Sequence, residues 1–389
     1  MLRRISLHLL FFCLALPSVS RDAAWGTVEQ CSLRPRDEQG TCYEQALADI
    51  VQRSGPQPAL AVLEQLVASA PGTQENAHHL AHHVGRIAYA RYHDMPQAFT
   101  SCTNAFASGC YHGVLEAHLS GTPHLAPRDV AEICRGVRDP LRPAFTHFLC
   151  VHGLGHGLVM YFHDDMFTAL TFCDALPDPF DRENCYGGAF MQNVMAFRAQ
   201  GNGGHDHHGN HAGHAAPAKP RKLLDPADPL YPCTEVAVKY RRSCYLMQSS
   251  AVLLLNGGDF AKTFLACQNV PAEYRNICLQ SIGRDISAFT LTNPETTKNI
   301  CALVASPQSG QCLYGAAKDF IYTHTDPQRG IALCRLADEV DKKDCYKGVR
   351  DFVLDLEPDE AKRKQTCRSA DARYRGLCRG SRLWFLMFF

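Results

Sequence analysis

Apolar residues recur through most of this 389-residue chain at the spacing of amphipathic helices, in paired segments joined by a polar turn. The stretch 260–289 is typical: one helical segment ends near Cys267, a turn follows, and a second segment opens at Cys278. The apolar stripe of that second segment consists of Ile282, Ile286 and Phe289. This pattern predicts an all-α fold made of helical hairpins.

The cysteines follow the same pattern, because each predicted hairpin carries one at the end of its first helix and one at the start of its second. First cysteines of the last five pairs recur at steps of 34, 34, 33 and 33 residues, which is the signature of stacked helical repeats. The nine successive pairs are Cys31 with Cys42, Cys102 with Cys110, Cys134 with Cys150, Cys173 with Cys185, Cys233 with Cys244, Cys267 with Cys278, Cys301 with Cys312, Cys334 with Cys345, and Cys367 with Cys378.

Each pair predicts a disulfide within its own hairpin, since such a bond joins the ends of adjacent helices without a long-range crossing. Under the chain-entropy model, closing a loop of about a dozen residues contributes ~2 to 3 kcal/mol to stability. The step of 71 residues from Cys31 to Cys102 is about twice the period. It predicts one further hairpin without cysteines, with helices over 58–67 and 76–92, and therefore a solenoid of about ten hairpins.

The N-terminal residues 1–20 have the pattern of a cleaved signal peptide, because Arg3 and Arg4 precede an apolar stretch and small residues follow it. Cys13 lies in this stretch, so the mature chain keeps an even number of cysteines. In an exported protein that number favours disulfides over metal thiolates. No later segment approaches the ~20 apolar residues that span a membrane. We expect a secreted or periplasmic protein whose apolar end, 383–389, packs on the last repeat.

An insertion rich in Gly, His, Ala and Pro occupies 200–229, between Cys173 and Cys233. We expect a disordered surface loop that separates the N-terminal repeats, 21–199, from the C-terminal repeats, 230–389. The 39 basic and 39 acidic residues leave a formal net charge of zero. The charge therefore favours neither nucleic acid nor an acidic membrane surface as a partner.

The repeat period and the helix-turn-helix pattern resemble those of tetratricopeptide and Sel1-like repeat proteins. The cysteine-rich Sel1-like proteins join their hairpins by disulfides in the same way. The resemblance implies a helical solenoid, and solenoids commonly bind other proteins along the concave surface. The consensus side chains of these families are not evident in this chain, so no particular partner or activity is implied.

Three consecutive second helices carry potential metal ligands four residues apart, on one helical face. The ligands stand two and six residues after Cys110 and Cys150, and an upstream segment repeats the spacing with Asn76 in place of cysteine. Neighbouring helices lie ~10 Å apart, so their side chains could share an ion at the ~2.0 to 2.1 Å distances that zinc or copper requires. The six cysteine-led helices at Cys42 and after the insertion lack the pattern. The predicted ligand pairs are His78 with His82, His112 with Glu116, and His152 with His156.

Five imidazoles and one carboxylate favour one or two ions of zinc or copper over metals that prefer oxygen ligands. Met191, at the corresponding position of the next helix, is either a thioether ligand that would favour copper or a core methionine. The insertion adds further imidazoles, which either collect metal loosely or belong to a soluble spacer. They are His205, His207, His208, His211 and His214.

Three functions remain open from the sequence. The first is acquisition, storage or delivery of a transition metal, which the histidine-rich insertion favours. The second is a metal-dependent hydrolase or a copper oxidase or oxygenase, with Glu116 as ligand or general base. The third is a protein-interaction scaffold without metal. The chain has no Gly-rich phosphate loop, nucleophile elbow, HExxH sequence or CxxCH haem-attachment sequence.

Overall fold

The structure is a computed structural model that describes residues 21–70, 73–137, 143–201, 222–357 and 359–380. In these ranges it contains nineteen α-helices, and the only β-type pairing is an isolated bridge between Asp225 and Asp228. The helices are α1 (Arg21–Cys31), α2 (Arg36–Ser54), α3 (Pro56–Ser69), α4 (Gln74–Tyr92), α5 (Met95–Thr100), α6 (Ala105–Ser120), α7 (Pro127–Ile133), α8 (Pro143–Tyr161), α9 (Met166–Cys173), α10 (Pro179–Gly201), α11 (Val238–Leu255), α12 (Phe260–Gln268), α13 (Arg275–Phe289), α14 (Pro294–Cys301), α15 (Gln308–His324), α16 (Pro327–Leu336), α17 (Glu339–Leu356), α18 (Glu360–Thr366) and α19 (Arg375–Arg379). The all-α prediction is confirmed.

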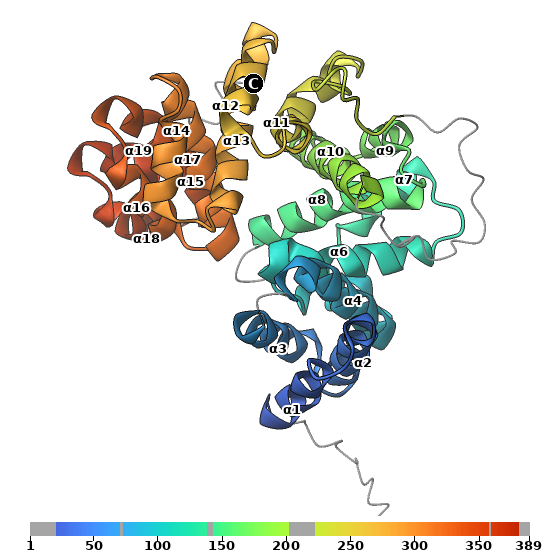
Figure 1. The fold of residues 1–389 in the computed structure, drawn as a ribbon. Coiled ribbons are helices and arrows are strands. Elements are labelled where there is room, and N and C mark those ends of the chain that lie inside the picture. The colour runs from blue at the N-terminus through green and yellow to red at the C-terminus, as the bar shows by residue number, and fades with distance from the viewer. Residues whose placement is uncertain (1–20, 71–72, 138–142, 202–221, 358, 381–389) are drawn as a thin grey trace, which may run out of the picture.

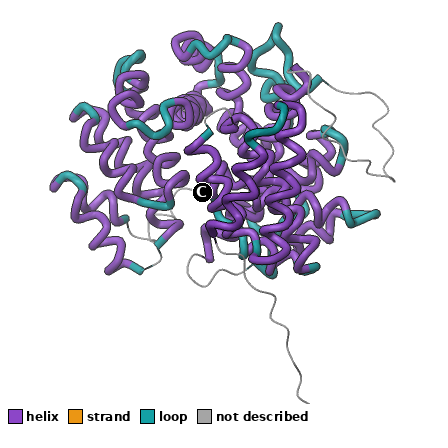
Figure 2. The backbone as a smooth tube through the Cα atoms, turned by 60° about the horizontal axis from the view of Figure 1, so that its bottom comes forward, coloured by secondary structure: helices purple, strands orange, loops and turns teal. Residues whose placement is uncertain are grey.

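The helices form the predicted repeat of hairpins (Figure 2). In most hairpins the second helix is longer than the first. The hairpin without cysteines consists of α3 and α4, close to the predicted ranges. One unit differs from the prediction, because the segment before Cys233 forms turns in place of a first helix. Pro226, Pro229 and Pro232 follow one another at three-residue intervals there, and each removes a backbone donor that a helix needs.

All nine predicted disulfides are present, each within its own hairpin. In every one the two Cα atoms lie between 5.5 and 5.9 Å apart, within the usual range for a disulfide. The bonds join Cys31 to Cys42, Cys102 to Cys110, Cys134 to Cys150, Cys173 to Cys185, Cys233 to Cys244, Cys267 to Cys278, Cys301 to Cys312, Cys334 to Cys345, and Cys367 to Cys378. The disulfide prediction therefore needs no correction.

Two kinds of side chain recur next to the disulfides, and the sequence pattern did not predict them. In several units an arginine three residues before the second cysteine donates to the carbonyl of the residue three places after the first cysteine. Arg275 donates in this way to Val270 at 3.0 Å. The tyrosine that directly follows the second cysteine of a unit packs on a tyrosine of the next unit. Tyr245 packs on Tyr274 in this way, with 5.1 Å between the ring centroids. These contacts hold each turn closed and join successive units.

Glycines three residues after the second cysteine set the distance between neighbouring second helices. A Cβ on Gly188 of α10 would lie 1.9 Å from the carbonyl oxygen of His152 on α8, and one on Gly315 of α15 would lie 1.8 Å from that of Gln280 on α13. In both cases the residue contacted stands two places after its own cysteine. Only glycine allows two helical backbones to approach this closely.

The same contact corrects the predicted alignment of α4. Gly113 of α6 meets the carbonyl of His82, where a Cβ would lie 2.0 Å from the oxygen. His82 is therefore the residue of α4 that lies level with His112 and His152, and the place of the missing cysteine is Leu80, not Asn76. The prediction was wrong by one helical turn, because spacing along one helix does not fix its position against the next helix when no disulfide is present.

The array curves back on itself, so that α15 and α17 lie beside α6 and α8 (Figure 1). Tyr322 of α15 packs on Phe145 and Phe148 of α8 at ring-centroid distances of 5.9 and 6.1 Å. Phe352 of α17 lies 6.0 Å from Phe145. The Tyr322 hydroxyl also hydrogen-bonds to Ser108 Oγ at 3.0 Å. Aromatic contacts between residues far apart in the sequence thus join two arms of the solenoid, the near arm with α6 and α8 and the far arm with α15 and α17.

Part of the insertion, predicted as a disordered loop, packs against the repeats. Residues 222–229 of the predicted loop are ordered as turns, and Leu223 and Leu224 are buried, with Asn193 donating to the Leu223 carbonyl at 2.6 Å. The first two residues of the insertion, 200 and 201, end α10. Residues 202–221, the signal peptide and the apolar end 383–389 lie outside the described residues. Of the predicted stripe on α13, Phe289 is 67% exposed, because it is the last residue of the helix. Among the described helices, none has the length and apolar character needed to cross a membrane.

Candidate metal centre

Three imidazoles from two adjacent helices form a group that could hold a metal ion. His78 and His82 lie one turn apart on α4, and His112 comes from α6. One ligand atom from each lies within 4.8 Å of the other two. The Nε2 atoms of His78 and His82 face each other at 3.0 Å. The close packing at Gly113 brings α4 and α6 near enough for this group to form.

The outer nitrogens of this pair are held by oxygen acceptors. Nδ1 of His78 lies 2.7 Å from the carbonyl oxygen of Phe106, and Nδ1 of His82 lies 3.4 Å from a carboxylate oxygen of Glu116. Since a carbonyl and a carboxylate can only accept, both Nδ1 atoms donate, and in the neutral rings both Nε2 atoms carry lone pairs. Metal-ligating histidines are commonly oriented by such an acceptor on the other ring nitrogen.

Glu116, predicted as a ligand, lies behind His82 and outside the group of three. Its oxygen accepts from His82 and also from Arg86 Nη1 at 3.0 Å. Burial acts to raise the pKa of Glu116, but the hydrogen bond from His82 and the charge of Arg86 outweigh it and lower that pKa. Glu116 is therefore an ionised carboxylate that orients His82, and Arg86 compensates its charge.

The pair on α8 has the same arrangement with different acceptors. Nε2 of His152 and Nε2 of His156 face each other at 3.3 Å, and Nδ1 of His156 lies 3.0 Å from Gln192 Oε1 on α10. A hydrogen bond with the backbone of Asn184, also on α10, holds His152. His156 is 2% exposed and His152 is 9% exposed. This pair is more deeply enclosed than the pair on α4.

His112 connects the two pairs. Its ring centroid lies 5.4 Å from that of His82 and 4.5 Å from that of His156, on which it stacks. Its Nδ1 is buried and has no hydrogen-bond partner in the described structure. The structure therefore brings five of the six predicted ligands into one continuous row of imidazoles, while Glu116 stands beside it.

Burial favours the neutral form, which binds metal, in four of these imidazoles. It lowers the pKa of His78 to about 4 and that of His152 to about 4. It also lowers the pKa values of His112 and His156 well below the ordinary range, and the neighbouring imidazoles add to this effect.

The sequence suggested further ligands in Met191 and in the insertion, and these stay predictions. Met191 is a partly buried side chain packed against the hydrophobic core. The histidines of the insertion, from His205 to His214, lie outside the described residues.

The oxygen acceptors were missed by sequence reasoning. Phe106, Ala107 and Ser108 have φ values of 52°, 50° and 65°, so the start of α6 makes a left-handed turn that points the Phe106 carbonyl at His78. Non-glycine residues seldom adopt this conformation, and no glycine or asparagine in these positions announces it. Gln192 stands seven residues after Cys185, one place beyond the position that the sequence pattern singled out.

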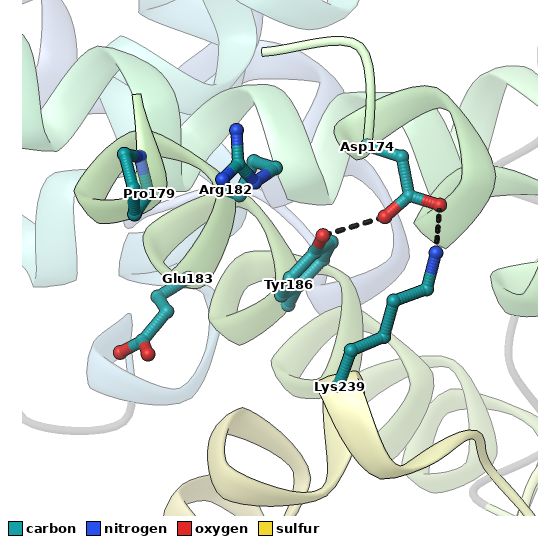
Figure 3. A pocket seen from close by; sticks show the side chains of 6 residues that line it. All are labelled: Asp174, Pro179, Arg182, Glu183, Tyr186 and Lys239. Carbon is teal, nitrogen blue, oxygen red and sulfur yellow. Dashed lines mark hydrogen bonds and ion pairs between the residues drawn. The ribbon is translucent and has the colours of Figure 1, made fainter. Parts of the chain in front are cut away.

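A surface pocket elsewhere in the molecule has a structural explanation. It lies between α10 and the start of α11 and is shown in Figure 3. Asp174 accepts hydrogen bonds there from Tyr186, Lys239 and Tyr240 at 2.6, 2.7 and 2.7 Å. Because these donors come from two successive units, the carboxylate joins the units, and three donors already occupy it.

No family model, curated protein or solved structure matches the chain. The resemblance to Sel1-like and tetratricopeptide proteins therefore extends to the helical-repeat architecture alone.

Proposed function

We propose that this chain is an exported helical repeat protein that binds a zinc or copper ion through His78, His82 and His112, for metal acquisition, storage or delivery. Support for export comes from the N-terminal pattern and from nine disulfides, which are typical of oxidising compartments. With all cysteines of the described hairpins oxidised, imidazoles are the ligands that remain for a borderline metal.

The observation that carries the proposal is the pair of facing lone pairs on His78 and His82. Two partly buried acceptors 3.0 Å apart repel each other unless a cation or a shared proton lies between them. The lowered pKa of His78 disfavours the proton. A metal ion satisfies both nitrogens, and His112 supplies a third from the adjacent helix. Zinc and copper accept three imidazole ligands of this kind.

Burial favours metal binding over catalysis at this group. A catalytic metal keeps a coordination position open to substrate, whereas His112 is 7% exposed and the His82 side chain is 12% exposed. Glu116, the candidate general base, is already engaged by His82 and Arg86. These contacts support handling of the metal itself.

The test uses the full chain purified without a metal-affinity tag, with the five histidines of the insertion replaced by serine. Zinc and copper are loaded separately, excess metal is removed, and bound metal is measured by mass spectrometry. We expect stoichiometric metal in this background and a loss of about 100-fold or more in affinity after His82→Ala with His112→Ala.

His118→Ala is the matched control, because His118 lies on α6 but outside the row, bonded to Tyr89 at 3.2 Å. It should keep the metal. Circular dichroism checks that all variants retain their helices. Metal content that is the same in the double variant and in the control would refute the proposal.

A further inference from the structure

The pair on α8 repeats the features of the pair on α4 without sharing any of its acceptors. The facing Nε2 atoms are 3.0 Å apart in the pair His78 and His82, and 3.3 Å apart in the pair His152 and His156. The α4 pair is oriented by α6 and its left-handed turn, and the α8 pair by two residues of α10. Two different sets of neighbours thus produce one geometry, in which the lone pairs of two imidazoles converge.

Aromatic rings surround the second pair. Phe148 stacks on the His152 ring at 5.8 Å, and Tyr322 from the far arm packs edge-on against Phe148 at 6.1 Å. On the other side, the His112 ring stacks on His156. Two acceptor nitrogens that face each other in such a buried place repel each other unless a cation or a shared proton lies between them.

The guanidinium of Arg284 is a cationic group close to this pair. Arg284 of α13 is near enough to His152 to contribute to the lowering of its pKa, after burial. Its guanidinium lies 2.8 Å from Asp285 Oδ1 and also donates to Ser250 Oγ at 2.7 Å. The paired carboxylate compensates the charge of Arg284, so its presence does not oppose a bound cation as a lone arginine would.

We propose that His152 and His156 form a second site for a zinc or copper ion, next to the first and more enclosed. This inference rests on the proposed function of the first group. His112 lies between the two sites, with its unpartnered Nδ1 buried among the imidazoles. The chain then holds two ions in a row, and the ion at the deeper site exchanges more slowly with solution.

The test counts ions and follows their release in the same full-length background, with serine in place of the histidines of the insertion. Zinc-loaded and copper-loaded proteins are mixed with a chelator in excess. We expect two ions per chain and a fast and a slow phase of release. His152→Ala with His156→Ala should leave one ion and abolish the slow phase, whereas His78→Ala with His82→Ala should leave one ion that is released slowly. His118→Ala should retain both ions.

A second variant keeps both ligands in case the double variant does not fold. Gln192→Ala removes the acceptor on His156 Nδ1, and the loss of such an outer partner typically weakens metal binding by about 10- to 100-fold. The slow phase should accelerate accordingly while the fast phase is unchanged.

The outcomes separate the two proposals. One ion per chain that survives His152→Ala with His156→Ala refutes the second site and leaves the first intact. An unchanged slow phase in Gln192→Ala also refutes the second site. No bound ion in the background protein refutes the proposed function as well.

Discussion

Individual ionisable side chains on the second helices of the hairpins differ in how the free-energy cost of their burial is offset. His78 and His152 avoid the cost of a buried charge by remaining neutral, as their lowered pKa values indicate. Asp319 of α15 shows the opposite effect on an acid, since burial raises its pKa to about 6 despite the opposing charge of Arg284. A carboxylate in such a place reduces stability at neutral pH.

Asp319→Asn should therefore stabilise the protein at pH 7. The folded-state pKa of Asp319 lies above its value in the unfolded chain, so its favourable contribution is complete below about pH 4 and is lost as the pH rises through about 6. At about 1.4 kcal/mol per pKa unit, the variant should gain roughly 3 kcal/mol at pH 7 and far less at pH 4. The urea midpoints of both proteins at the two pH values provide the measurement. A gain of equal size at both would contradict the assignment.

The candidate ligands could be found in the sequence, but their roles could not. The four-residue spacing places His78 with His82 and His152 with His156, because residues one turn apart share a helical face. It cannot show that Glu116 orients His82, since that depends on how far α4 is shifted along α6. Nor does it reveal the Phe106 carbonyl, because backbone acceptors carry no residue signature.

Contacts between helices are decided by a few small residues in this fold. The period and the cysteine spacing predict the hairpins and their disulfides, because those features are local to each unit. The position of one second helix against the next depends on glycines such as Gly113 and Gly188, whose missing side chains admit the neighbouring backbone. The alignment of α4, which has no disulfide, was for this reason displaced by one turn.

Gly113→Ala should separate α4 from α6 and weaken metal binding. The new Cβ would lie 2.0 Å from the His82 carbonyl oxygen, so the helices must move apart, at a cost of about 1 to 3 kcal/mol. Thermal melting and metal content are measured together. Both should fall in this variant.

Gly40→Ala provides the matched control for helix propensity. Gly40 lies within α2 and a Cβ there meets nothing within 4 Å, so alanine should raise stability by up to ~1 kcal/mol without affecting the metal. If Gly113→Ala behaved like Gly40→Ala, the close contact between α4 and α6 would not control the site.

The whole molecule is more closed than its repeat pattern implies. A period near 34 predicts a solenoid, but its curvature is the sum of small rotations between successive units, which no single unit encodes. In this chain the rotations bring Tyr322 of α15 against α6 and α8 (Figure 1). The contact falls on the left-handed turn 106–108, whose Phe106 carbonyl holds His78.

Closure of the arms and retention of metal should therefore depend on each other. Three successive non-glycine residues with positive φ cost of the order of 1 to 3 kcal/mol each, and such a turn persists only when its surroundings hold it. Ser108 and Asn104 hold it from the side of the far arm, through the Tyr322 hydroxyl at 3.0 Å and the Tyr322 carbonyl at 3.3 Å. His78 holds it from the side of the metal site.

Tyr322→Phe removes the bond to Ser108 and keeps the aromatic ring. The loss of one hydrogen bond, about 1 kcal/mol, should speed metal release about fivefold if the turn relaxes and frees His78. Tyr314→Phe is the matched control, because that hydroxyl also lies on α15 but bonds to Asp351 of α17. Chelator competition on both variants gives the release rates. Equal rates would mean that arm closure does not act on the site, whereas faster release in Tyr322→Phe alone would show that the far arm helps to retain the ion.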